Sequence, residues 1–206
     1  MDTLILAFDR AARTLSQSAI ARRPNPSLSV SIQSPLSAND TARSIGLMRV
    51  NHAGEVAAQA LYQGQAFGSR SPELRGKLAN AADEEMDHLA WTRDRIHELG
   101  GRTSLLDPVW YAGAFAIGAV AGSMGDRTSL GFLQATEEQV EAHLASHLGR
   151  LPEADQSSRA IVEQMKADET EHANMAHNLG ARELPAPIQT LMRLSAKVMT
   201  TVAQKI

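Results

Sequence analysis

The sequence predicts an all-α fold built around a bundle of four long helices. Apolar residues recur every three or four positions over long stretches, which is the spacing of one helix face. No stretch alternates convincingly with the period of two that a half-buried strand requires. Residues that favour helix starts and ends also fall at the limits of these stretches.

The ends of the second helix are the most clearly marked. Ser71 is a favourable N-cap, Pro72 suits the first helical position and Gly100 follows the last turn. Gly68 and Gly180 stand at the ends of the first and fourth helices. Because 206 residues suit one domain with accessory segments, we expect residues 40–206 to form a single domain. The expected bundle helices cover residues 40–68, 72–99, 126–150 and 153–179.

Two shorter amphipathic helices are expected outside the bundle. Residues 1–39 form an N-terminal extension, in which apolar residues at helical spacing lie near several arginines. This pattern predicts a basic amphipathic helix that docks on the domain or on a membrane surface. Residues 23–39, rich in proline and serine, are expected to form a linker, and residues 187–206 repeat the amphipathic pattern. The apolar positions of the first helix are Leu4, Phe8, Ala12 and Leu15.

Residues 108–125 carry no charged side chain. As a helix they would extend about 27 Å, at the lower limit for crossing a bilayer. Glycines and alanines make the segment only mildly apolar, so we expect it to be buried or to dip into a membrane. A core helix that caps the bundle is the alternative. Together with the basic amphipathic ends, the segment favours a protein that lies on one face of a membrane.

The composition excludes several classes of site. The chain has no cysteine, which rules out disulfides, thiolate zinc sites, iron–sulfur clusters and thiol catalysis. Its formal net charge of -3 offers no general attraction for nucleic acid, so no nucleic-acid partner is expected. A metal held by oxygen and nitrogen remains open, because the chain has 23 acidic residues and 7 histidines.

Each long helix places one glutamate on its apolar stripe, and two helices add a histidine three residues later. A buried, unpaired carboxylate is very costly, and lysine and arginine are scarce on these stripes, so an external cation is the simplest partner. Four glutamates and two histidines in two Glu-x-x-His pairs are the ligand set of ferritin-like di-iron and di-manganese bundles. The sequence therefore predicts a ferritin-like four-helix bundle that binds iron or manganese. The candidate ligands are Glu55, Glu85, His88, Glu137, Glu169 and His172.

The order of these residues strengthens the prediction. Glu55 precedes Glu85 by 30 residues. Glu137 precedes Glu169 by 32, so both halves of the chain follow one scheme. An acidic, solvated face on each helix, without a metal, is one alternative. A second alternative concerns the register of the helices, because a shift of the buried face by one residue would turn different acids inward. These acids are Glu84, Asp87, Glu138, Glu141, Asp168 and Glu171.

Other polar residues near the stripes have less definite roles. His52 lies one turn before Glu55 and is expected either to hydrogen-bond a ligand carboxylate or to be a polar core residue. Tyr62, on the same stripe, is expected to pack in the core. His97 and His177 are expected at the surface. His143 and His147 are expected either at the surface or packed in the core.

Residues 47–55 have the sequence LMRVNHAGE, which together with both Glu-x-x-His pairs forms a highly specific pattern. Residues 60–65 and 135–138 extend this pattern. These segments resemble the Coq7 family of demethoxyubiquinone hydroxylases. The resemblance covers about residues 40–206, and the first 39 residues look like the extension of bacterial members.

The resemblance implies a di-iron monooxygenase of ubiquinone biosynthesis, which uses O₂ to hydroxylate the ring of 2-polyprenyl-3-methyl-6-methoxy-1,4-benzoquinol. It implies that Glu55, Glu85 and His88 serve one iron. Glu137, Glu169 and His172 would serve the other, with Glu85 and Glu169 bridging. His143 matches a family histidine proposed to help electron transfer. The next residue is Leu144, where many members have tyrosine, so the resemblance does not supply that phenol here.

The same resemblance implies NADH as a reductant, other ubiquinone-biosynthesis proteins as partners and a peripheral position on the cytoplasmic side of the cell membrane. No Rossmann fingerprint supports a nicotinamide site independently. A homo-oligomer is also expected. Iron storage or peroxide handling on the same bundle is the alternative function, but it explains neither segment 108–125 nor the His-Ala-Gly-Glu string at residues 52–55. An acidic helical interaction module without metal is a third interpretation.

Overall fold

The computed structural model describes residues 2–16, 18–31 and 35–206, with side chains from residue 8 onward. Throughout these residues the chain is helical with no strand, which confirms the predicted all-α class. The elements are α1 (Asp2–Leu15), the short 3₁₀ helix η1 (Pro26–Ser29), α2 (Ala38–Gly68), α3 (Pro72–Glu98), α4 (Asp107–Ser123), α5 (Asp126–Arg150), α6 (Gln156–Asn178) and α7 (Ala186–Ala203).

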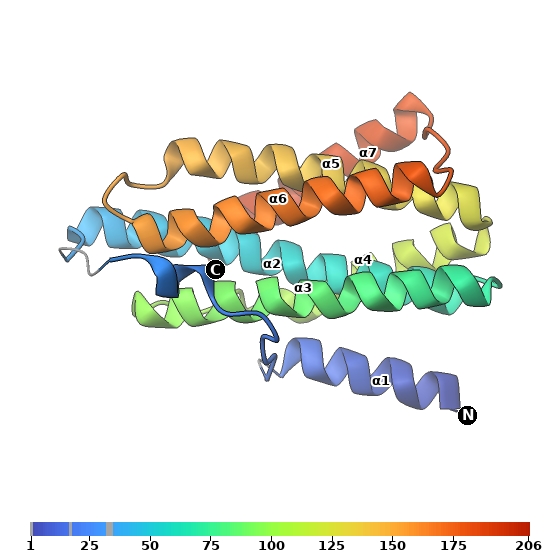
Figure 1. Ribbon diagram of the computed structural model, residues 1–206, viewed down its shortest axis with the longest axis horizontal. Helices are drawn as coiled ribbons and strands as arrows, with labels where there is room; N and C mark the ends of the chain where they lie inside the picture. Colours follow the sequence, from blue (N-terminus) through green and yellow to red (C-terminus); the bar gives the residue numbers. More distant parts are fainter. Residues whose placement is uncertain (1, 17, 32–34) are drawn as a thin grey trace.

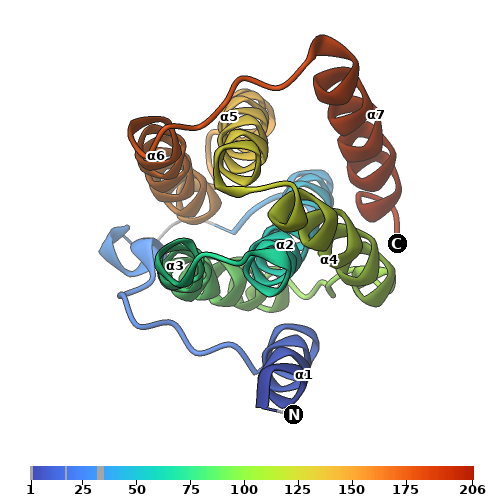
Figure 2. The same cartoon turned by 90° about the vertical axis from the view of Figure 1, so that its right-hand side faces the viewer.

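Helices α2, α3, α5 and α6 form the four-helix bundle (Figures 1 and 2). α2 packs on α3 and α5 packs on α6, and the two pairs meet along α2–α5 and α3–α6. Two apolar clusters fill the interior, one around Trp91 and Met165 and the other around Leu78 and Leu133. On α3, Glu85 and His88 lie between Leu78 of one apolar cluster and Trp91 of the other. One apolar cluster therefore lies on each side of a polar layer.

The helix ends agree with the predicted start and stop residues. Ser71 caps α3 by accepting a hydrogen bond of 3.2 Å from the backbone N–H of Leu74. Gly100 and Gly180 have φ angles of 77° and 88°, which glycine adopts at little cost. The start of α6 differs, because Asp155 is its N-cap and the helix begins at Gln156 rather than near residue 153.

Segment 108–125 forms most of α4, which lies along α2 instead of capping the end of the bundle (Figure 2). The two helices approach so closely that a Cβ atom on Gly64 would lie 2.2 Å from the carbonyl oxygen of Phe115. A Cβ on Gly118 would likewise lie 2.3 Å from the carbonyl oxygen of Leu61. The glycines that make this segment only mildly apolar therefore serve helix packing. Over the residues that the structure describes, no helix is both long and apolar enough to cross a membrane.

The two terminal helices pack on the flanks of the bundle. α1 docks through Ala11, Thr14 and Leu15, which face α2 and α4. The predicted apolar stripe of this helix is only partly used, because Phe8 is 76% exposed and the side chain of Leu4 lies outside the described residues. α7 packs on α2 and α5 at its C-terminal end and leaves most of its surface open.

Candidate metal centre

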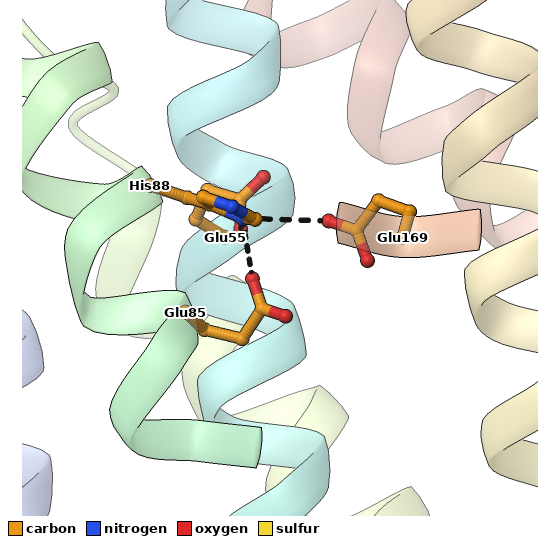
Figure 3. Close-up of side chains that lie close together, drawn as sticks. All are labelled: Glu55, Glu85, His88 and Glu169. Carbon is orange, nitrogen blue, oxygen red and sulfur yellow. Dashed lines mark ion pairs between the residues drawn. The ribbon is translucent and has the colours of Figure 1, made fainter. Parts of the chain in front are cut away.

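The six predicted ligands meet in the middle of the bundle. Glu55 comes from α2, Glu85 and His88 from α3, Glu137 from α5, and Glu169 and His172 from α6. None of these residues is more than 5% exposed. Ligand atoms of four of them lie within 4.8 Å of one another, and these four are shown in Figure 3: Glu55, Glu85, His88 and Glu169.

The two histidines share their carboxylate neighbours. Nδ1 of His88 lies 2.8 Å from Glu85 and 3.5 Å from Glu169 (Figure 3). Nδ1 of His172 lies 2.9 Å from Glu85 and 3.6 Å from Glu169. Glu85 and Glu169 therefore each approach both histidines, as carboxylates shared between two ions would.

The donor atoms of the cluster fit a bound metal pair. Both oxygens of Glu85, one of Glu55 and one of Glu169 are buried and form no hydrogen bond, and the same holds for Nδ1 of both histidines. Buried polar atoms in folded proteins are nearly always satisfied, so atoms left in this way in one place indicate a ligand. Arg95 does not neutralise them, because its guanidinium bonds Asp155 at 2.8 Å. The oxygen and imidazole donors suit iron or manganese.

The close packing of acids and imidazoles in the cluster shifts the pKa values of several of its members. Burial raises the pKa of Glu55 and of Glu137 well above the ordinary value. Burial alone would lower the pKa of His172, but the neighbouring carboxylates of Glu169 and Glu85 favour its charged form and raise the pKa to about 12. Metal binding must therefore release protons from the cluster.

The outer nitrogen, Nε2, of each histidine contacts an acid on the helix that carries the other histidine. Nε2 of His88 lies 2.7 Å from Asp168, the residue before Glu169. Nε2 of His172 lies 2.8 Å from Glu84, the residue before Glu85. Such partners fix the orientation of an imidazole ligand. Two acids that the sequence left as alternative ligands thus contact the histidines from outside the cluster.

Tyr62 packs in the core, as expected, and also contacts a candidate ligand. Its hydroxyl donates a hydrogen bond to Oε1 of Glu137, so this side chain supports a candidate ligand as well as packing. The sequence indicates this contact, because Tyr62 lies two turns after Glu55 on the same stripe and a buried tyrosine usually needs a polar partner.

His52 is a polar residue of the core. Its ring nitrogens face Thr92 at 3.4 Å and Asp107 at 3.7 Å. Burial lowers the pKa of His52 to about 3, and it raises that of Asp107 to about 7. His52 is therefore uncharged near neutral pH. Of the two roles left open by the sequence, the structure favours the polar core residue.

The remaining histidines lie apart from the cluster. His97 and His177 are exposed, as predicted. His147 is buried and its Nδ1 lies 2.7 Å from Asn51 Oδ1, and the ring of His143 lies 4.1 Å from that of His147. His143 and His147 line a cavity of about 140 Å³ to which none of the six candidate ligands contributes.

Comparison with known proteins agrees with this site. The model of the family described as ubiquinone biosynthesis protein COQ7 matches residues 42–203. A protein of Chromobacterium violaceum named 3-demethoxyubiquinol 3-hydroxylase is 56% identical over 200 residues, which are 97% of this chain and 97% of its own. Proteins of the same name from Variovorax paradoxus and Polaromonas naphthalenivorans are 56% and 57% identical, and each match covers 100% of this chain and 98% of theirs.

The solved structures support the fold. A dodecameric thioferritin, the bacterioferritin-related protein of Bacteroides fragilis, superposes with a TM-score of 0.57 over 76% of this chain and 90% of its own. At 17% sequence identity, this likeness concerns the ferritin-like fold alone. The family match spans most of the chain and includes all six residues of the buried cluster, so the chain belongs to the COQ7 family.

Proposed function

We propose that this chain is a di-iron monooxygenase that hydroxylates the ring of 2-polyprenyl-3-methyl-6-methoxy-1,4-benzoquinol with O₂, a step of ubiquinone biosynthesis. The observation that carries the proposal is the buried set of four glutamates and two histidines, in which several inward-facing oxygen and nitrogen atoms form no hydrogen bond. The set occurs in a chain more than half identical, along its whole length, to proteins named 3-demethoxyubiquinol 3-hydroxylase.

In this proposal each half of the bundle supplies one set of ligands. Glu55, Glu85 and His88 hold one iron, and the corresponding residues of α5 and α6 hold the other: Glu137, Glu169 and His172. The bound metal supplies the electrons and the Lewis acidity that O₂ activation requires.

The rest of the chain orients and shields the site. Tyr62 holds one oxygen of Glu137 in place, while Asp168 and Glu84 fix the outer nitrogens of the two histidines. The apolar clusters on both sides of the polar layer keep water away, which strengthens the charge interactions inside.

The proposal is tested with full-length protein loaded anaerobically with Fe(II). We expect two irons per chain and, after addition of a short-chain demethoxyquinol, ¹⁸O₂ and a reductant, a product that carries one ¹⁸O atom in mass spectrometry. Parallel reactions with NADH and with a chemical reductant decide whether NADH can act as the electron donor. Two bound irons with no hydroxylated product would contradict the proposal. Uptake of many irons per chain would favour storage.

We also propose that α1, α4 and α7 bring the protein to the surface of a membrane, from which it takes its polyprenyl substrate. The three helices lie along the flanks of α2, with α4 between the other two (Figure 2). Val120 on α4 is 61% exposed, and Met124, the C-cap of this helix, is 59% exposed. α7 exposes a row of apolar side chains one and two turns apart. Apolar side chains on such surfaces favour burial among lipid chains. The row on α7 is Leu191, Leu194 and Val198.

Changing all three residues of the α7 row to serine is expected to weaken vesicle binding by about tenfold or more, because it removes apolar area that the lipid would cover. The measurement is cosedimentation with vesicles of phosphatidylethanolamine and phosphatidylglycerol. Leu28→Ser is the matched control, since Leu28 is 79% exposed but lies in η1 beside α6. Unchanged sedimentation of the triple variant would refute this surface.

A further inference from the structure

The two candidate metal positions differ in how their histidines are supported. Asp168, the partner of His88, has a side chain only 12% exposed. Glu84, the partner of His172, has a side chain 60% exposed. Each of the two acids directly precedes a glutamate ligand in the sequence, but Glu84 is far more exposed to solvent than Asp168.

The difference arises from Arg23, in the segment that the sequence describes as a linker. Nε of Arg23 lies 2.7 Å from Asp87 on α3, and Nη2 lies 2.8 Å from Asp168 on α6. Nη2 also lies 3.4 Å from Nε2 of His88, so the guanidinium reaches the Asp168–His88 pair from outside. One arginine therefore connects the two helices that carry the Glu-x-x-His pairs.

Several contacts fix this arginine in place. Its guanidinium carbon lies 4.9 Å from the ring centroid of Trp91, whose ring neighbours that of His88. The backbone N–H of Arg22 donates a hydrogen bond of 2.6 Å to Asp87, which anchors the chain beside the guanidinium. Charge-assisted bonds to two partly or fully buried carboxylates are strong and directional. On the other side the side chain of Glu84 is solvent-exposed, and among the residues that the structure describes no arginine or lysine pairs with it.

We propose that Arg23 is a positioning residue that makes the two metal positions unequal, so that the position served by His88 holds its metal longer than the one served by His172. By fixing Asp168, Arg23 fixes the ring of His88 before any metal binds, which lowers the reorganisation that binding requires. His172 is oriented only by Glu84, a solvent-exposed carboxylate that has no arginine partner among the described residues. Arg23 lies outside residues 42–203, the part of the chain that the family model matches.

The inference rests on the proposed two-metal site and is tested by metal release. Full-length protein loaded anaerobically with Fe(II) is mixed with an excess of a chromophoric chelator in a stopped-flow instrument. We expect two phases of equal amplitude. Arg23→Ala is expected to accelerate the slow phase about tenfold and to leave the fast phase unchanged, while Arg23→Lys restores part of the slow rate. Glu84→Gln is expected to accelerate the fast phase alone.

Arg22→Ala is the matched control, because among the described residues the Arg22 side chain pairs with the exposed Asp83, at 3.1 Å, and not with Asp168. Its release kinetics should equal those of the parent protein. A general loss of stability would accelerate both phases, so the selective effect distinguishes positioning from folding. Binding of fewer than two irons by the parent protein would overturn the proposed function and this inference together. Two bound irons released in a single phase, or an Arg23→Ala variant that changes both phases or neither, would overturn this inference alone.

Discussion

Replacing Glu137 by alanine is expected to reduce hydroxylation to below about 1% of the parent rate and to leave fewer than two irons per chain. Glu137 is 1% exposed and lies among the carboxylates and histidines at the centre of the bundle. Loss of a partner outside the ligand shell already costs about 10- to 100-fold in metal affinity or activity, and a direct ligand should cost at least as much. The variant also leaves the hydroxyl of Tyr62 without its carboxylate.

The adjacent acid supplies the control for this experiment. Glu138 is exposed and accepts a hydrogen bond of 2.7 Å from Gln134 at the surface, so Glu138→Ala should keep both iron and activity. Iron per chain is measured after gel filtration, product by mass spectrometry, and helix content by circular dichroism. A Glu137→Ala protein with two irons and normal turnover, or a Glu138→Ala protein without them, would show that the register of α5 has been assigned wrongly.

Changing Gly118 to alanine is expected to destabilise the protein by about 3 kcal/mol, because a single methyl group would force α2 and α4 apart. The new Cβ would lie 2.3 Å from the backbone oxygen of Leu61, and a backbone atom cannot move aside as the end of a side chain can. For a chain of this size, the midpoint of thermal unfolding should fall by roughly 6–12 °C.

Gly113→Ala on the same helix is the control for that substitution. A Cβ at Gly113 would meet no atom of another described segment within 4 Å, and alanine favours the helix over glycine by up to about 1 kcal/mol. Its midpoint should stay the same or rise. Thermal unfolding followed by circular dichroism compares the two variants. Equal midpoints would mean that the close approach of α2 and α4 does not limit stability.

The helices and the content of the central cluster could be predicted from the sequence because their signals are local. Helical periodicity places Glu85 and His88 on the same face as Leu78, and that face must be buried in any bundle. A carboxylate on a buried face needs a compensating charge, so the metal site follows from the stripe together with the scarcity of basic residues. The structure buries all six predicted ligands, which agrees with this register.

The position of segment 108–125 could not be predicted in the same way. Glycine and alanine in an uncharged stretch are compatible with a mildly apolar membrane segment and with a closely packed helix, and composition does not distinguish them. The distinction lies in the partner, because Gly118 is required only if another backbone passes at that point. The partner is α2, about 50 residues earlier in the chain.

What the sequence by itself determined is the set of helices, the face that each one buries and the donor atoms gathered at the centre, since all three depend on the repeat of a single helix. The surroundings of those atoms were decided only by tertiary structure. His88 is held by Asp168, which is held in turn by Arg23, and these residues lie far apart along the chain. No period or motif connects them, because their contact exists only once α3, α6 and the N-terminal segment have packed together.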